Sequence, residues 1–136
     1  MAVTYNSTLK TNRMQLVPDL ISGKAAAAST GTATAGWLVI GDSTLSAPST
    51  GILAKLPLNA TPGTVTGNVF TITVTGVTAS ATATGTAAKA ELWTNGNSPV
   101  VQGLTVGTSG TDIVISSTTI SSGQTITLTS GNITHG

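Results

Sequence analysis

The sequence predicts an all-β protein: an antiparallel, jelly-roll-like β-sandwich with a short helical or extended N-terminal arm. Residues 71–75 (TITVT) and 125–129 (TITLT) carry the clearest signal, because they alternate apolar and hydroxyl side chains. A period of two with β-branched residues is typical of strands that bury one face. Turn signals such as Asn95-Gly96-Asn97 separate segments of this kind. A sheet with one apolar face is usually covered by a second sheet, which predicts a sandwich.

The chain of 136 residues is long enough for one domain with its own hydrophobic core. We expect three parts: an N-terminal arm (1–24), an Ala/Thr/Gly connector (25–36) and a β-sandwich domain (37–136). The connector lacks large side chains to bury, which is typical of flexible linkers.

The arm differs from the rest of the chain because its apolar residues follow a helical period. Asn6 or Ser7 can cap a helix over residues 8–17, which Pro18 then stops or bends. Two interpretations stay open. The helix closes one end of the sandwich, or it docks on a neighbouring subunit. In the second case the candidate interface residues are those at helical spacing, Leu9, Arg13 and Leu16.

About eight strands are expected after the arm. Pro57 lacks an N–H and places the end of its strand at a sheet edge. A turn at Ser130-Gly131 is expected to separate the last long strand from Ile133. The segments with strand patterns are residues 37–40, 52–58, 69–75, 77–84, 86–94, 100–106, 112–116 and 125–129.

One strand carries a second candidate interface. Lys89, Glu91 and Trp93 alternate with Ala90 and Leu92, so they share the face opposite the expected core. The strip is either solvated or buried against a partner, since Trp is enriched where protein surfaces meet. We predict that Trp93 lies in a subunit contact with Lys89 and Glu91.

The sequence offers no constellation for catalysis, a metal or a cofactor. There is no cysteine, and the one histidine, His135, is next to the last residue. Asp42 and Asp112 lie beside glycine-containing loops, where Asp commonly accepts hydrogen bonds from its own backbone. We therefore predict a protein that is not an enzyme and has no cofactor or metal.

Charge is sparse, at 7% charged residues and a formal net charge of +1. Nucleic-acid binding needs clustered Lys and Arg, but the five basic residues are scattered. Weak charge suits a protein that lives packed against a partner. No apolar run approaches the roughly 18 residues of a membrane span, and residues 1–24 lack a continuous apolar signal core. We expect synthesis in the cytoplasm and no nucleic-acid or membrane partner.

Three stretches resemble a known group of proteins. They are NRMQLVPDLISG (12–23), GTAAKAELW (85–93) and the ending from residue 103 to 136. Together they are similar to the small capsid cement, or decoration, proteins of tailed bacteriophages, in particular Bordetella-phage-like short-tailed viruses. The shared motifs are strand and turn patterns, and that family has no catalytic residues to carry over.

The resemblance implies a structural virion protein. Such a protein binds the outside of a bacteriophage capsid and cements neighbouring major capsid protein subunits, which stabilises the head. The implied location is the capsid surface of the virion, after synthesis in the host cytoplasm. Its partners would be the major capsid protein and further copies of itself, as a homodimer or alternatively a trimer. The alternative function is a glycan- or receptor-binding β-sandwich module of a phage tail fibre or adhesin.

Overall fold

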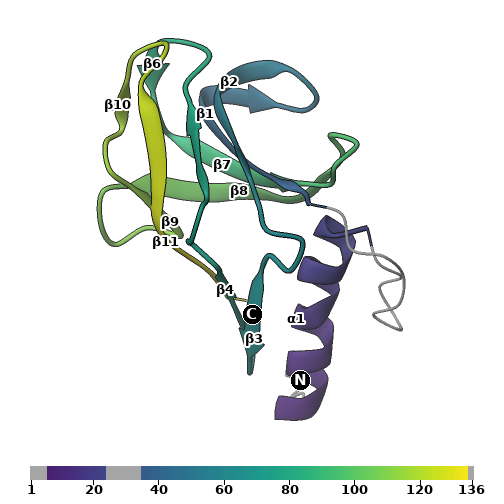
Figure 1. Ribbon diagram of the computed structural model, residues 1–136. Helices are drawn as coiled ribbons and strands as arrows, with labels where there is room; N and C mark the ends of the chain where they lie inside the picture. Colours follow the sequence, from purple (N-terminus) through teal and green to yellow (C-terminus); the bar gives the residue numbers. More distant parts are fainter. Residues whose placement is uncertain (1–5, 24–34, 135–136) are drawn as a thin grey trace.

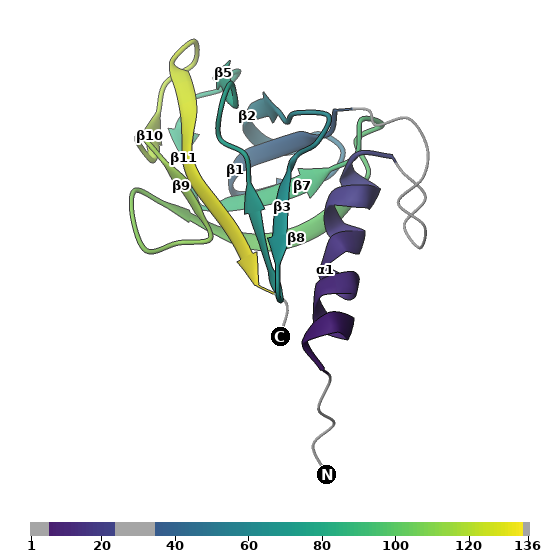
Figure 2. The ribbon, with the colours of Figure 1, turned by 60° about the horizontal axis from the view of Figure 1, so that its bottom comes forward.

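The computed structural model describes residues 6–23 and 35–134. Within them the chain forms one N-terminal helix and a mostly antiparallel β-structure, as Figures 1 and 2 show. The predicted all-β sandwich with a short N-terminal helix is confirmed. Most of the expected connector, residues 25–36, lies outside the described residues.

Helix α1 (Ser7–Ile21) begins after Asn6, whose Oδ1 accepts a hydrogen bond from the backbone N–H of Leu9 at 2.8 Å. Asn is a preferred N-cap because its side chain satisfies an N–H that has no partner within the helix. Pro18 was expected to stop or to bend the helix. It does not stop it, since the helix continues through Pro18 to Ile21. The proline removes one backbone hydrogen bond, and burial of Pro18 and Ile21 offsets that loss.

In the described residues the helix is followed by eleven strands, nine of which form one sheet. The sheet order is β2-β1-β7-β8-β9-β11-β4-β3, with β5 also paired to β11, while β6 and β10 pair separately. All pairs are antiparallel except β8 with β9. The strands are β1 (Trp37–Ser46), β2 (Thr50–Pro57), β3 (Gly63–Thr66), β4 (Val69–Ile72), β5 (Thr78–Ser80), β6 (Gly85–Thr86), β7 (Lys89–Trp93), β8 (Pro99–Gly107), β9 (Ile113–Ile115), β10 (Thr119–Ile120) and β11 (Thr125–Thr134).

The large sheet curls so that its two halves face each other. Strands β2, β1, β7 and β8 form one layer, and β9, β11, β4, β3 and β5 form the other (Figures 1 and 2). Just after β5, the backbone N–H of Thr82 donates to the carbonyl oxygen of Leu53 in β2 at 2.8 Å. This bond ties the second layer back to the edge strand of the first. Strand β2, which ends at Pro57, is an edge strand as predicted.

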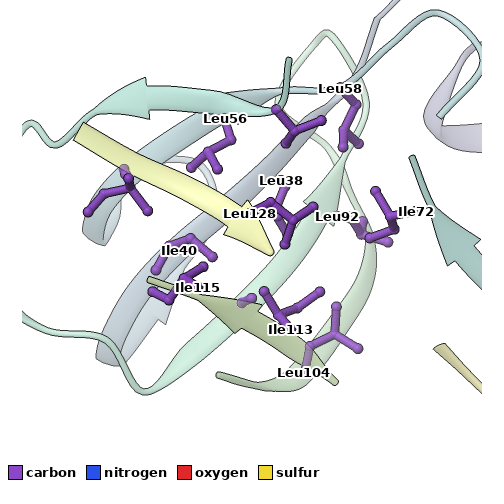
Figure 3. Packing of buried hydrophobic residues seen from close by; sticks show 14 of the residues in the cluster. Leu38, Ile40, Leu56, Leu58, Ile72, Leu92, Leu104, Ile113, Ile115 and Leu128 are labelled. Carbon is purple, nitrogen blue, oxygen red and sulfur yellow. The ribbon is translucent and has the colours of Figure 1, made fainter. Parts of the chain in front are cut away.

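Aliphatic side chains from both layers fill the core (Figure 3). Leu38 of β1 and Leu92 of β7 come from one layer and are 0% exposed. Ile113 of β9 and Leu128 of β11 come from the other and are 0% and 2% exposed. The strand alternation at residues 89–93 and 125–129 therefore identified Leu92 and Leu128 correctly as core residues.

Helix α1 closes one end of the core. Met14 and Ile21 are 1% and 0% exposed and belong to the main apolar cluster. The helix lies beside β3 and β4, as Figure 2 shows. Of the two interpretations of the arm, the structure therefore supports the one in which the helix covers the sandwich.

Strand β11 is longer than expected because the turn at Ser130-Gly131 does not form. The strand runs from Thr125 to Thr134, with a register shift between Leu128 and Ser130 in its pairing with β9. A β-bulge of this kind absorbs an extra residue without ending the strand. The glycine signal was therefore an irregularity inside a strand rather than a break.

Strand β3 was also missed: residues 63–66 lie outside the predicted strand segments, since Thr61-Pro62-Gly63 is a typical turn sequence. Gly63 is the first residue of β3 and pairs with Ile72 of β4. A Cβ at position 63 would lie 2.0 Å from the backbone oxygen of Thr71. The absence of a side chain at Gly63 therefore allows the backbones of β3 and β4 to lie close together.

The burial pattern of β11 makes a direct stability prediction. Ile126 is 0% exposed, whereas Thr127 is exposed on the opposite face. We expect Ile126→Ala to lower the free energy of unfolding by about 2–5 kcal/mol and Thr127→Ala by less than about 0.5 kcal/mol. Urea unfolding followed by circular dichroism measures both. Equal losses, or the reverse order, would show that the inside and outside faces are assigned wrongly.

Candidate functional site

The outward face of α1 carries three leucines in line. Leu9, Leu16 and Leu20 are 42%, 37% and 44% exposed, and we call them the outer stripe. Among the described residues, the only other exposed large hydrophobic side chain is Val74. Apolar side chains gathered on one exposed face commonly mark a contact surface. Two of the predicted interface residues, Leu9 and Leu16, thus lie on the surface.

Arg13, the third predicted interface residue on the helix, is half-buried. Its position between Leu9 and Leu16 in helical spacing places it on the same side of α1 as the stripe. Leu20 was missed because the helix was expected to end before Pro18. The interval of four residues from Leu16 to Leu20 would have revealed it.

The predicted strip on β7 is not a surface. Trp93 is 0% and Glu91 5% exposed, and only Lys89 is exposed. The indole Nε1 of Trp93 donates to Glu91 Oε1 at 2.7 Å, and Gln102 Nε2 donates to Glu91 Oε2 at 3.3 Å. Neither Trp93 nor Glu91 offers surface to a partner, which corrects their assignment to an interface.

The β1–β2 hairpin covers Trp93. A second apolar cluster joins Trp93 to Val39 and Leu45, both from β1. Gly41 lets the hairpin fold back onto the sheet, because a Cβ there would lie 2.6 Å from the carbonyl oxygen of Gly51 and 2.7 Å from Leu45 Cβ. The face opposite the main core is therefore locally a small core of its own.

Lys55 completes this cluster. Its Nζ lies 4.6 Å from the ring centroid of Trp37 and 5.6 Å from that of Trp93. The same Nζ donates to Asn97 Oδ1 at 2.6 Å. An ammonium over an aromatic face is attracted by the ring quadrupole. Lys55 thus stands over the ring of the half-buried Trp37.

Asp42 has the turn role that the sequence predicts. Its Oδ1 accepts hydrogen bonds from the hydroxyl of Thr44 at 2.6 Å and from the backbone N–H of Thr44 at 2.8 Å. These two bonds, with a smaller contribution from the charge of Lys89, hold the pKa of Asp42 below its usual range. The carboxylate therefore serves local structure.

The other aspartates are also engaged. Asp112 Oδ2 accepts from the backbone N–H and the hydroxyl of Thr105, both at 3.0 Å. This bond ties the start of β9 to β8, so the expected contact of Asp112 with its own backbone is replaced by one between strands. The buried Asp19 accepts from Gln15 Nε2 at 3.2 Å on the same helix. Both residues have structural partners within the fold.

The outer side of the second layer carries hydroxyl and amide groups but no charge. Strands β3, β4, β5 and β11 contain no Lys, Arg, Asp or Glu. Some outward side chains bond across strands, as Thr71 Oγ1 does to Asn132 Oδ1 at 3.0 Å. We call this surface the hydroxyl face. Its exposed residues are Thr64, Thr66, Thr71, Thr78, Ser80, Thr125, Thr127, Thr129, Asn132 and Thr134.

Register brings the hydroxyl face together. Asn132 of β11 pairs with Thr71 of β4, which pairs with Thr64 of β3. At the other end of β11, Thr127 pairs with Thr78 of β5. The sequence pattern showed only that Thr71 and Thr127 point outward from their strands. It did not show that four strands place these residues on one side.

In the described part of the chain, His, Cys, Asp and Glu form no group of three that could hold a metal ion. The helix at residues 7–21, within that part, falls short of the length and apolar character needed to cross a membrane. His135 and Tyr5 lie outside the described residues.

Comparisons with known proteins leave the chain without an assigned family. No family model matches it, and neither curated proteins nor solved structures give a match.

Proposed function

We propose that this chain is a structural virion protein that binds the outside of a bacteriophage capsid. It cements neighbouring major capsid protein subunits and thereby stabilises the head. The hydroxyl face is the surface that contacts the shell. The observation that carries this proposal is the absence of charge from four strands whose outward residues share one side of the sheet.

Burial of such a face against another protein costs little. A charged side chain must be desolvated and paired when an interface forms, and the desolvation penalty can exceed the gain from pairing. Hydroxyl and amide groups need only a hydrogen-bond partner, which a second protein surface or a bridging water supplies. The centres of protein interfaces are depleted in charged residues for this reason. The hydroxyl face has that property over its described strands.

The sequence resemblance to capsid cement proteins supports the identity of the partner. The packing of α1 and both layers of the sheet around one core adds a second argument. Since α1 and both layers share one core, the hydroxyl face is held on a rigid support. A rigid contact surface loses little conformational entropy on binding.

The glycan-binding alternative has less support. Sugar recognition on a β-sandwich calls for exposed aromatic side chains grouped together. Phe70 and Trp93 are 0% exposed, and Lys55 stands over the ring of the half-buried Trp37. The aromatic side chains in the described residues therefore pack within the fold and do not form an exposed group for a sugar.

Co-sedimentation with capsids tests the proposal. The probe is expanded heads that lack this protein, prepared from the virus that encodes it. Wild-type protein should pellet with these heads and saturate at a fixed number of copies per shell. The double variant Thr64→Lys/Thr129→Lys should bind at least about tenfold more weakly, because it places two unpaired charges in the contact. Both positions are exposed and lie on different strands of the hydroxyl face.

The matched control is Ser43→Lys/Thr108→Lys. Both of these residues are exposed, and neither lies on the strands of the hydroxyl face. This variant adds the same charge and should bind like the wild type. Failure of the wild-type protein to pellet with the heads would overturn the proposal. Equal loss in both variants would show that net charge matters and that the hydroxyl face does not.

A further inference from the structure

We propose that Lys55 and Asn97 form an isopeptide bond within the chain, which makes this pair a site of self-modification. In the bond, Lys55 Nζ becomes part of an amide with the side-chain carbonyl of Asn97, and ammonia is released. The inference concerns a covalent bond inside one chain, so it is independent of capsid binding and of the hydroxyl face. It rests on a contact between two residues that are 42 positions apart in the sequence.

The two reacting groups are already in contact. Lys55 lies in the edge strand β2, and Asn97 lies in the turn between β7 and β8. Lys55 Nζ donates a hydrogen bond to Asn97 Oδ1 at 2.6 Å. Because a C=O bond is about 1.2 Å long, this contact places Nζ within about 3.8 Å of Asn97 Cγ. Reacting atoms in a productive arrangement are about 3–3.5 Å apart, so only a small movement separates the contact from the bond.

Two indole rings hold the lysine side chain in this position. Lys55 Nζ lies 4.6 Å from the ring centroid of Trp37 and 5.6 Å from that of Trp93. Trp93 is 0% exposed, and its Nε1 donates to the buried Glu91, so its ring is fixed. A lysine side chain in solution samples many rotamers, and folding has already restricted this one. Groups that are held together in this way react as one unit, without the entropy loss of an encounter.

The turn presents the asparagine in an unusual backbone conformation. Among the described residues, Asn97 is the one non-glycine residue with a positive φ, which is 65°. Its backbone N–H donates to the carbonyl oxygen of Thr94 at 3.0 Å and closes the turn. Glycine adopts a positive φ at the lowest cost, so glycine would suffice for the turn alone. Contact with Lys55 requires a side chain at this position, and the amide of Asn97 provides it.

The reaction needs no reagent beyond the two side chains and water. Lys55 is half-buried, so water can remove the proton of its ammonium form. The neutral amine then attacks Asn97 Cγ, and the Nζ–Cγ bond forms. The Cγ–Nδ2 bond breaks, and Nδ2 takes up the proton that the amine loses and leaves as ammonia. Nothing is oxidised or reduced. The neighbours Asn95, Gly96 and Ser98 are exposed, so ammonia can pass directly into solvent.

The bond ties an edge strand to a turn on the far side of β1. Strand β1 lies between β2 and β7 in the sheet, so the link spans three neighbouring strands. A cross-link between residues distant in the sequence restricts the unfolded chain and thereby stabilises the fold, as a disulfide does. The chain has no cysteine. An isopeptide bond gives it a covalent clamp that needs no oxidant and that reducing agents do not open.

Peptide mapping of the full-length protein tests the proposal. After incubation of the folded protein at mildly alkaline pH, which supplies more neutral amine, the intact mass should be lower than the sequence mass by one ammonia. Trypsin cleaves after Lys and Arg, but an acylated Lys55 is not a cleavage site. Digestion of the denatured protein should therefore give peptide 25–89 joined to peptide 90–136. Without the bond the same region gives three separate peptides, 25–55, 56–89 and 90–136.

Two matched variants each remove one reacting group. Lys55→Arg keeps a positive charge that can lie over Trp37, but a guanidinium that stays protonated is not a nucleophile. Asn97→Gly keeps the positive φ of the turn and removes the amide. Both variants should keep the circular dichroism of the wild type, give only separate peptides and show their full sequence mass. Both should also melt at a lower temperature than the linked wild-type protein.

Three outcomes overturn the inference. Wild-type protein that keeps its full mass after the incubation and gives separate peptides would show that Lys55 and Asn97 share only a hydrogen bond. Ammonia loss with separate peptides would place the loss in a succinimide at Asn95-Gly96, the one Asn-Gly pair in the chain. Joined peptides in Asn97→Gly would assign the link to another side chain. Capsid co-sedimentation can succeed in every case, so failure here is distinguishable from failure of the proposed function.

Discussion

Trp93→Ala should lower the free energy of unfolding by about 3–5 kcal/mol, the usual cost of truncating a buried large aromatic side chain. Trp93 is 0% exposed and packs against Val39 and Leu45, so the truncation opens a cavity beneath the β1–β2 hairpin. It also removes the indole N–H that donates to the buried Glu91. Urea unfolding followed by circular dichroism is the suitable measurement, since the variant loses a fluorophore.

Trp93→Phe separates packing from hydrogen bonding at the same position. Phenylalanine keeps most of the apolar volume but leaves Glu91 Oε1 without the indole donor. Loss of a partner for a buried polar group costs about 1–3 kcal/mol, so this variant should fall between the wild type and Trp93→Ala. If Trp93→Ala instead kept wild-type stability and lost self-association in sedimentation, Trp93 would be an interface residue after all.

Ile21→Ala should destabilise the fold by about 2–5 kcal/mol, as truncation of a buried aliphatic side chain does. Ile21 is 0% exposed and is part of the main core. The packing there is close, since a Cβ on Gly36 would lie 2.5 Å from Ile21 Cγ2. Thermal melts at low protein concentration measure the loss without a contribution from self-association.

The neighbouring residue provides the control. Leu20 is 44% exposed, so Leu20→Ala should change the free energy of unfolding by no more than about 0.5 kcal/mol in the dilute protein. The two truncations are adjacent on one helix and differ mainly in the face they affect. Similar stability for Ile21→Ala and Leu20→Ala would mean that α1 is attached loosely, and the docking interpretation of the arm would regain its support.

Strand alternation was the part of the fold that the sequence predicted well. Ile126 and Leu128 are buried while Thr127 between them is exposed. A period of two is a local property, and it needs no knowledge of which strands become neighbours. The cap at Asn6 was predictable for the same reason, because its bond to Leu9 spans a single turn.

Burial on the second side of a sheet was not predictable in this way. Alternation correctly set Trp93 and Glu91 opposite the core residues Ala90 and Leu92. It gave no sign that the β1–β2 hairpin folds over that side. The cover depends on close approach at Gly41, a contact between segments distant from β7 in the chain.

The candidate surfaces needed tertiary information in different degrees. The outer stripe was within reach of the sequence, and only the assumption that Pro18 ends the helix hid Leu20. The hydroxyl face could not be predicted from the sequence, because its residues share one side only when β11 pairs with both β4 and β5. Pairing partners follow from topology, which a pattern of residue types does not encode.

The edges of the sheet have a consequence for crowding. Open strand edges are templates on which other chains can add and grow into aggregates. Here β2 ends in Pro57 and receives the N–H of Thr82 at the carbonyl of Leu53. The other edge, β3, has only 4 residues and lies beside α1. With a net charge of +1, copies standing close together have little electrostatic repulsion to separate them. The shortness of β3 and the partial cover of β2 therefore limit strand addition at the two edges. In many other proteins a highly charged surface has that effect.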